Sequence, residues 1–191
     1  MKLRKEFYQN EEVVDVARQL LGKVLYTNIN GIKTAGIITE TEAYSQLEKG
    51  SHAYNGRRTA RTEVMFGHGG YAYVYLCYGM YYLFNVVTGT KDHAQAVLVR
   101  AIQPYFGVEV ILKRRNAKKL SKNLLNGPGK VCAALGINKL HYGTDLGGNT
   151  IWIEDKNIKV NKKQVLTTPR IGIHYAGTDA LLPWRFVLQE E

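Results

Sequence analysis

Hydrophobic and polar positions in the first 45 residues predict a helix followed by a β-hairpin. Apolar side chains recur at helical spacing from Val13 to Leu21, after Asn10, a residue that caps helix starts. Two runs with strand character, 23–29 and 32–44, flank Asn30-Gly31, which is typical of a type I′ turn. We therefore expect an N-terminal helix and then a hairpin with a long second strand.

The rest of the chain gives strand and helix signals in irregular order. Residues 45–70 lack periodicity and carry five glycines, which predicts a long, ordered and functional loop. Because strands and helices do not alternate regularly, the pattern favours a mixed α+β protein over a doubly wound one. The remaining predicted elements are a hairpin over 71–87 bending at Tyr78-Gly79, a strand over 94–102 stopped by Pro104, helices over 106–115 and 128–135, and strands over 150–154, 170–173 and 185–188.

Composition narrows the class of protein. A length of 191 residues with 45% hydrophobic residues suits one domain, 1–191, without metal or disulfide support. The two cysteines, Cys77 and Cys132, are far apart, which excludes a cysteine-based zinc module, a four-thiolate iron–sulfur cluster and a disulfide scaffold. Residues 1–8 lack a signal-peptide core, and the apolar run 73–87 is too short to span a bilayer. We expect a cytoplasmic protein.

The net charge of +10 is concentrated in the middle of the chain. Residues 51–100 hold five basic and two acidic side chains, and residues 101–150 hold eight and two, so this stretch carries +9. Such a basic surface favours a polyanion as partner: DNA, RNA or an anionic membrane. The alternative is that the charge serves only solubility.

Two carboxylates stand out as candidate catalytic groups. Glu40 and Glu42 are two apart in a predicted strand and share a face with Tyr44, where partial desolvation raises a carboxylate pKa and suits base chemistry. From spacing alone, exposed acids are the commoner alternative. Paired acids also suit a metal-dependent nuclease, but no Asp-rich cluster that would hold magnesium lies nearby in the sequence.

Tyrosines cluster where the second hairpin is predicted. Core packing is the common role of strand tyrosines, yet many hydroxyls are hard to satisfy in a core, and tyrosine rings also stack on bases. An aromatic side chain at a hairpin tip, as predicted for Tyr78, can wedge between base pairs. Six of the thirteen tyrosines lie within twelve residues: Tyr71, Tyr73, Tyr75, Tyr78, Tyr81 and Tyr82.

Other polar residues leave two interpretations open. Asn85 and Arg100 interrupt apolar strands, so each either has a buried partner or lies at a strand end facing water. His52 in the glycine-bearing loop is more often a surface residue than a catalytic one. The arginines at 57, 58 and 61 suit either a phosphate clamp or a solvated loop.

Ten short segments follow one another along the chain: Glu40–Tyr44, His52, Arg57–Arg61, Met65-Phe66, Tyr73–Tyr81, Asn85, Leu98–Ala101, Gly127–Leu135, Ile137–Lys139 and Pro169–Ile173. Any one segment is a weak signal, but the ordered series is specific. In this order the segments resemble the alkyladenine (3-methyladenine or methylpurine) DNA glycosylase family, and the resemblance extends from about residue 11 to residue 188.

The resemblance implies a fold and a reaction. The fold would be α+β, a single compact domain around a curved antiparallel sheet with flanking helices. The activity would be that of a monofunctional hydrolase without metal, cofactor or lyase activity. It would flip alkylated or deaminated purines out of double-stranded DNA and hydrolyse the N-glycosidic bond with an activated water, initiating base excision repair. We expect a monomer without an obligate protein partner or a membrane, associated with the nucleoid.

The resemblance also implies residue roles. Glu42 would deprotonate the attacking water and Arg100 would help hold that water or the adjacent phosphate, with His52 beside the base as a third catalytic residue. Tyr44 and Tyr75 would sandwich the flipped base. The remaining roles are Asn85, with His52, in substrate binding, Tyr78 in intercalation, and Arg57, Thr59, Arg61, Met65, Met80 and Lys130 in DNA contacts.

Two alternative functions, from other classes of protein, remain open. A non-enzymatic nucleic-acid-binding module would use the tyrosines as stacking platforms and the basic face for phosphates. A metal-dependent nuclease would use Glu40 and Glu42 and would cut strands instead of releasing bases.

Overall fold

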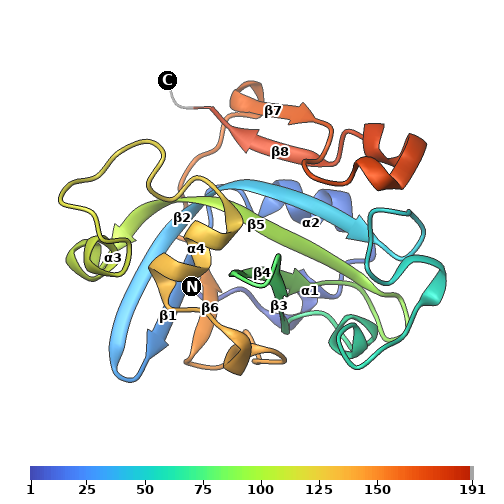
Figure 1. The fold of residues 1–191 in the computed structure, drawn as a ribbon, viewed down its shortest axis with the longest axis horizontal. Coiled ribbons are helices and arrows are strands. Elements are labelled where there is room, and N and C mark those ends of the chain that lie inside the picture. Colours follow the sequence, from blue (N-terminus) through green and yellow to red (C-terminus); the bar gives the residue numbers. More distant parts are fainter. Residues whose placement is uncertain (190–191) are drawn as a thin grey trace.

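One eight-stranded antiparallel sheet organises the chain in the computed structural model, which describes residues 1–189 (Figure 1). The main path runs β3-β4-β5-β2-β1-β6, and the β7–β8 hairpin joins it through β8 and β2. The last two residues of the domain predicted over 1–191 lie outside the described residues. The strands are β1 (Val24–Ile29), β2 (Ile32–Ser45), β3 (Ala72–Cys77), β4 (Tyr81–Val87), β5 (Gln95–Phe106), β6 (Ile151–Glu154), β7 (Val165–Thr168) and β8 (Arg185–Leu188).

The predicted fold class is confirmed, with one difference in shape. The described residues form a single α+β domain, and every strand pair is antiparallel, but the sheet is not strongly curled. β2 is long enough to pair with β1 near its start and with β8 at Glu40–Glu42, while β5 runs beside almost its whole length. A single strand thus reaches both the N-terminal and the C-terminal hairpins.

Helices cover both sides of the sheet. On the side away from the cavity described below, Thr41 of β2 donates a hydrogen bond to the Ala17 carbonyl of α2 at 2.8 Å. α4 packs on β4 and β5 and lies in front of the sheet in Figure 1. The helices are α1 (Lys5–Tyr8), α2 (Val13–Gln19), α3 (Val108–Arg114) and α4 (Pro128–Leu135), with short 3-10 helices η1 (Tyr54–Gly56), η2 (Glu63–Phe66), η3 (Lys139–His141), η4 (Lys162–Gln164) and η5 (His174–Leu181).

Both predicted hairpins form at their turn residues. Asn30 and Gly31 adopt φ of 54° and 77°, as a type I′ turn requires, and join β1 to β2. Tyr78 and Gly79 adopt φ of 51° and 68° and begin the short connection from β3 to β4. A non-glycine residue with positive φ is uncommon, so the backbone of Tyr78 is held in a restricted conformation at the hairpin tip.

Three boundaries differ from the sequence prediction. Asn10 accepts the Glu12 amide instead of capping a helix at that point, so α2 begins at Val13. Pro104 does not stop β5, because it pairs with Gly36 where β2 shifts register, and a bulge accommodates a residue without an N–H. Residues 170–173 form a turn, and the strand before them is β7.

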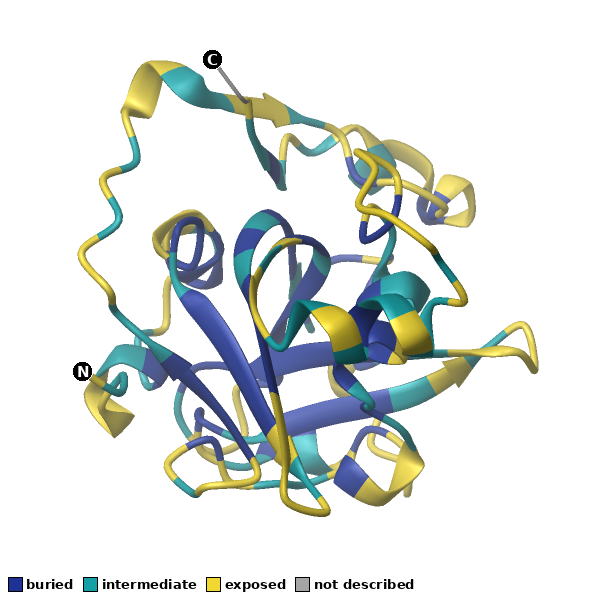
Figure 2. Ribbon diagram, turned by 90° about the vertical axis from the view of Figure 1, so that its left-hand side faces the viewer, coloured by how far each residue is buried: buried dark blue, intermediate teal, exposed yellow. Residues whose placement is uncertain are grey.

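Buried residues concentrate along the strands and the inner sides of the helices (Figure 2). The main core joins α2, α4 and the central strands, and a smaller cluster around Met65, Phe66 and Tyr73 packs beneath the glycine-bearing loop. Within the described part of the chain, no helix is both long and apolar enough to cross a membrane.

Candidate active site

A cavity of about 800 Å³ opens on the side of the sheet opposite α2. Strands β3, β4 and β5 contribute Tyr75, Asn85 and Leu98, and α4 contributes Lys130 to its lining. The loop 50–52 and the turn after β7 complete it. The predicted loop, the tyrosine hairpin and α4 therefore meet around one cavity.

Glu42 lies immediately behind the cavity wall. Its side chain is fully buried, and the three residues that contact it, Tyr44, Arg100 and Ile171, all line the cavity. The Tyr44 hydroxyl donates to Oε2 at 2.8 Å, the Ile171 amide donates to Oε1 at 2.8 Å, and Arg100 Nη1 donates to Oε2 at 3.3 Å. The carboxylate is thus fixed by donors from three separate segments.

Burial sets the acidity of this carboxylate. Desolvation raises the pKa of Glu42 above its usual value, and the Arg100 charge, the Ile171 amide and the Tyr44 hydroxyl only partly oppose it. Burial and the neighbouring Glu42 also raise the pKa of Tyr44, which keeps its hydroxyl protonated as a donor. A carboxylate with a raised pKa is a better proton acceptor, so Glu42 is suited to activating a water.

Glu40 occupies the same side of β2 but differs in its partners. Its Oε1 accepts from Arg100 Nε at 2.9 Å and from Arg185 Nε at 2.6 Å, and its side chain is 4–5% exposed. Both acids are therefore buried, and the alternative of exposed acids is wrong. Arginines neutralise both carboxylates, which disfavours the metal-ligand role that a nuclease would require.

His52, Tyr73 and Tyr75 form an aromatic wall of the cavity. His52 Nδ1 lies 2.8 Å from the Tyr73 hydroxyl, and the His52 ring contacts Tyr75 at 4.7 Å between centroids with an interplanar angle of 77°. Burial, with the charges of Arg61 and Arg57, lowers the pKa of His52 to about 4. The imidazole is therefore neutral at neutral pH, and burial likewise raises the pKa of Tyr75 and keeps its hydroxyl protonated.

The two polar residues inside apolar strands both have buried partners. Asn85 on β4 is 3% exposed, lines the cavity and donates through Nδ2 to the Tyr73 carbonyl at 3.0 Å. Arg100 on β5 is held by the two glutamates. Burial lowers the pKa of Arg100, but the charges of Glu42 and Glu40 outweigh it and raise the pKa, so the guanidinium stays cationic. Neither residue lies at a strand end facing water.

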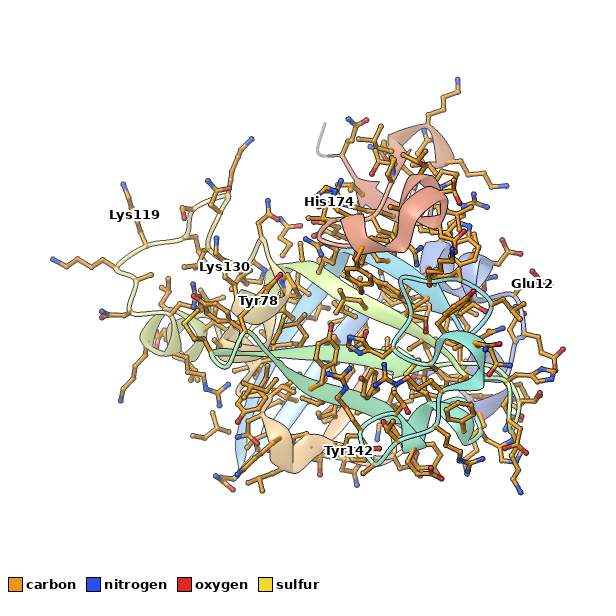
Figure 3. All side chains as sticks on the ribbon, turned by 45° about the vertical axis from the view of Figure 1, so that its right-hand side comes forward. Glu12, Tyr78, Lys119, Lys130, Tyr142 and His174 are labelled. Atoms are coloured by element: carbon orange, nitrogen blue, oxygen red, sulfur yellow. The ribbon has the colours of Figure 1, made fainter. Side chains whose placement is uncertain are left out.

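Tyr78 projects from the tip of the β3–β4 hairpin. Its side chain is 84% exposed, whereas Tyr73 is buried and Tyr75 is half-buried. Tyr78 nevertheless lines the cavity together with Lys130, and Figure 3 shows the two on the same side of the molecule, with Lys119 farther out. The tyrosine cluster therefore contains wall residues and two exposed side chains that line the cavity, Tyr78 at the hairpin tip and Tyr81, which is 53% exposed.

The predicted DNA-contacting residues are mostly exposed around the cavity. Arg57, Thr59, Arg61 and Met80 are exposed, and Lys130 is half-buried and donates to the Asn123 carbonyl. Met65 differs, because it is 1% exposed and packs with Phe66 and Tyr73. It therefore forms part of the cavity wall instead of an exposed DNA-contacting surface, a distinction that an apolar residue in a loop does not reveal.

Sequence reasoning missed four residues near the site. Ile171 contributes a main-chain amide, Arg185 contacts Glu40, and Tyr175 lines the cavity while donating to the Gly50 carbonyl at 3.1 Å. Arg170 stacks on Tyr44. All come from the C-terminal third of the chain, where a short strand was predicted in place of the turn.

The fold and the site together define a class of enzyme. The cavity offers aromatic walls for a flat ring, a buried carboxylate beside it, and an exposed tyrosine and basic side chains at its rim. These features suit a hydrolase that acts on a nucleic-acid base taken out of the helix.

Comparison with known proteins identifies the family. The sequence pattern of the methylpurine-DNA glycosylase family matches residues 6–191. The chain is 48% identical over 192 residues to a protein of Chlamydia abortus, covering 97% of both chains, and 44% identical over 197 residues to one of Clostridium acetobutylicum, covering 99% and 95%. Both carry the name "Putative 3-methyladenine DNA glycosylase", as does a Bacillus cereus protein at 46% identity over 97% of this chain and 95% of that protein.

This chain belongs to the methylpurine-DNA glycosylase family. It is therefore a DNA glycosylase, a hydrolase of N-glycosidic bonds that acts on alkylated purines in DNA and initiates base excision repair. The family expected from the sequence is confirmed.

Proposed function

We propose that this glycosylase flips 3-methyladenine and related damaged purines, deaminated ones included, out of double-stranded DNA and hydrolyses their N-glycosidic bond with a water activated by Glu42. The observation that carries the proposal is the buried Glu42 carboxylate directly behind a cavity walled by Tyr44, Tyr75 and His52. The substrate follows the names of the similar proteins, and the cavity chemistry agrees with it.

Aromatic walls suit an alkylated base. N-alkylation gives a purine positive charge, and the faces of Tyr44 and Tyr75 attract a planar cation. Because the pKa of His52 is lowered to about 4, its imidazole adds no positive charge beside the base at neutral pH. The same neutral wall accepts an uncharged lesion by stacking alone.

Glu42 and Arg100 perform the chemistry. The water oxygen bonds to the anomeric carbon of the sugar while the bond to the purine nitrogen breaks, and the water proton passes to the Glu42 carboxylate. The bonding electrons leave with the purine, a better leaving group when it is already cationic. The carboxylate also stabilises positive charge that develops on the sugar, and Arg100 orients the water or the adjacent phosphate.

Asn85 provides discrimination against a normal base. Its amide is buried, fixed by the hydrogen bond to the Tyr73 carbonyl, and aimed into the cavity. The 2-amino group of guanine, placed at this wall, meets an amide that has no room to move aside. Specificity then comes from repulsion of the undamaged purine as well as from attraction of the damaged one.

The enzyme acts as a monomer in the cytoplasm and is bound to the nucleoid through the basic surface of residues 51–150. Arg57, Thr59, Arg61, Met80 and Lys130 contact the DNA around the flipped nucleotide. Lys130 lines the cavity and donates to the Asn123 carbonyl at 2.9 Å, and we expect water instead of a lysine amine to attack the sugar.

The reaction products test the proposal. With a duplex containing a single 3-methyladenine and excess EDTA, we expect release of the free base and a DNA strand that stays intact until alkali cleaves the abasic site. Chromatography of the base and denaturing electrophoresis measure the two outcomes. Tight binding without base release would support the nucleic-acid-binding module, and magnesium-dependent strand cuts would support the nuclease.

Removing the Tyr78 side chain should make base flipping less favourable without lowering the stability of the fold. Tyr78→Ser deletes a side chain that is 84% exposed, so the melting temperature should barely change. Unstacking a base costs a few kcal/mol, which the inserted ring no longer offsets. Excision from a stable duplex should slow by about tenfold or more, equivalent to about 1.4 kcal/mol.

A comparison of substrates isolates this effect. Excision from single strands or from a mismatch requires little unstacking, so Tyr78→Ser should slow it less than excision from a paired duplex. Equal slowing on both substrates would falsify the role of Tyr78 in flipping. Tyr175→Ser is a matched control, because Tyr175 is also an exposed tyrosine lining the cavity but does not lie on the hairpin tip. It should lack the duplex-selective defect.

A further inference from the structure

An arginine–glutamate pair lies buried behind the cavity wall. The side chains of Arg170 and Glu48 are 0% and 4% exposed, and two parallel hydrogen bonds of 2.7 Å join the guanidinium to the carboxylate. Arg170 also donates to the carbonyls of Ala43 at 2.9 Å and Asp179 at 3.1 Å. These contacts fix the plane of the guanidinium, since bidentate pairing sets orientation as well as distance.

Arg170 touches the surroundings of Glu42 in two ways. Its guanidinium lies 4.7 Å from the centre of the Tyr44 ring, and Tyr44 lines the cavity whereas Arg170 does not, so the cation packs on the buried side of the ring. The next residue, Ile171, donates its amide to Glu42 Oε1. One side chain therefore supports both the hydroxyl and the amide that hold the Glu42 carboxylate.

Stability alone does not account for this pair. An apolar pair of similar volume is often as stable as a buried ion pair or more so, because two charges must lose their hydration. The ion pair supplies hydrogen bonds of fixed direction. These bonds connect the loop at Glu48 and the turn at Arg170 to β2, next to Tyr44 and Glu42. The arrangement points to a role in placing groups at the active site.

We propose that Arg170, fixed by Glu48, is a positioning residue of the excision reaction that holds the Tyr44 hydroxyl and the Ile171 amide against the Glu42 carboxylate. This inference rests on the proposed role of Glu42 as the base. Arg170 itself touches neither the substrate nor the attacking water.

The role has a pH signature. Glu42 is faced by Arg100 from β5, by Tyr44 and Glu40 from β2, by the Ile171 amide from the turn after β7, and through Glu40 by Arg185 of β8. Tyr75 of β3 also interacts electrostatically with Glu42. The Tyr44 hydroxyl and the Ile171 amide both lower the Glu42 pKa against the effect of burial. Loosening these two donors raises that pKa, so the acid limb of the excision rate moves to higher pH.

A double substitution separates positioning from stability. Arg170→Met with Glu48→Met replaces the ion pair by apolar side chains of similar length, which need not destabilise a buried site. We expect single-turnover excision at pH 7 to slow by at least about tenfold, since small misplacement of a catalytic group is costly. We also expect an acid limb shifted to higher pH and an unchanged Kd for lesion-containing DNA. Arg170→Lys, which keeps the charge but loses the planar fork, should give the same pattern.

The control is a substitution in the remote core. Leu25→Ala on β1 removes a fully buried side chain that does not line the cavity, and it should lower the melting temperature without changing the excision rate at a temperature where the variant is folded. Wild-type excision and an unmoved acid limb in the folded double variant overturn the positioning role. The same rate loss in Leu25→Ala overturns it as well, because general destabilisation then explains the effect.

Glu42→Gln distinguishes a failure of Glu42 as the base from a failure of Arg170 as a positioning residue. If Glu42→Gln is inactive while the double variant excises normally, only the role of Arg170 fails. If Glu42→Gln retains excision, the proposed base is wrong and the positioning role falls with it. Both proposals are supported if Glu42→Gln and the double variant are both impaired in excision, the acid limb of the double variant moves to higher pH, and the acid limb of Leu25→Ala does not move.

Discussion

Glu42→Gln is expected to abolish base release while leaving the affinity for lesion-containing DNA nearly intact. Glutamine keeps the size of the side chain, but its single amide oxygen can replace only one of the two carboxylate oxygens that accept from Tyr44 and Ile171, and it cannot take a proton from water. A general base contributes about 10²–10⁴-fold to a rate, and we expect a loss in that range. Single-turnover excision with excess enzyme, alongside a binding titration, measures the two quantities separately.

Glu40→Gln shows which carboxylate is the base. Glu40 shares the face and the burial of Glu42 but contacts Arg100 and Arg185. Its neutralisation weakens the restraint on Arg100, so we expect a smaller loss of excision together with a lower melting temperature. A loss of excision under threefold for Glu42→Gln, or a larger loss for Glu40→Gln than for Glu42→Gln, would contradict the assignment of Glu42 as the base.

Affinity for duplex DNA should fall steeply as salt is raised. The stretch 51–150 carries +9, and its Arg61 and Lys130 line the cavity. Contact with about four to six phosphates predicts a slope of log K against log salt of roughly −4 to −5. Fluorescence anisotropy at several salt concentrations measures it, and a flat dependence contradicts a role of this stretch in binding the DNA backbone.

Paired neutralisations locate the contacts. Lys118→Gln with Lys119→Gln removes two exposed charges in the loop between α3 and α4 and should reduce the slope by about two. Lys162→Gln with Lys163→Gln removes the same charge from two exposed lysines at η4, outside the basic stretch, and should leave the slope unchanged. Equal effects of the two pairs would indicate attraction by net charge alone.

Local signals account for the parts of the fold that the sequence predicted. The Asn30-Gly31 turn, Pro128 at the start of α4 and Gly136 at its end act within a few residues, and the structure places each boundary there. Pro104 misled because its strand position depends on a bulge at Tyr105 of β5, which is defined only by the pairing of β5 with Ala35 and Gly36 of β2. β7 was missed because its pairing with β8 is specified by residues twenty positions away.

The site was predictable where its residues lie close together in the sequence. Glu42 and Tyr44 share a strand face, and the tyrosines of β3 alternate on the hairpin. Their burial was not predictable, since the arginines that make it tolerable come from β5 and β8. Arg170 and Glu48 are 122 positions apart, and no periodicity connects residues across that distance.

The amide of Ile171 has a consequence for genetics. Since this donor to Glu42 belongs to the main chain, every residue type except proline supplies it. An alanine scan would therefore not detect this donor, and evolutionary drift at position 171 would leave the hydrogen bond intact. A proline would remove it in one step, so the hydrogen bond at this position is protected by backbone chemistry instead of by side-chain identity.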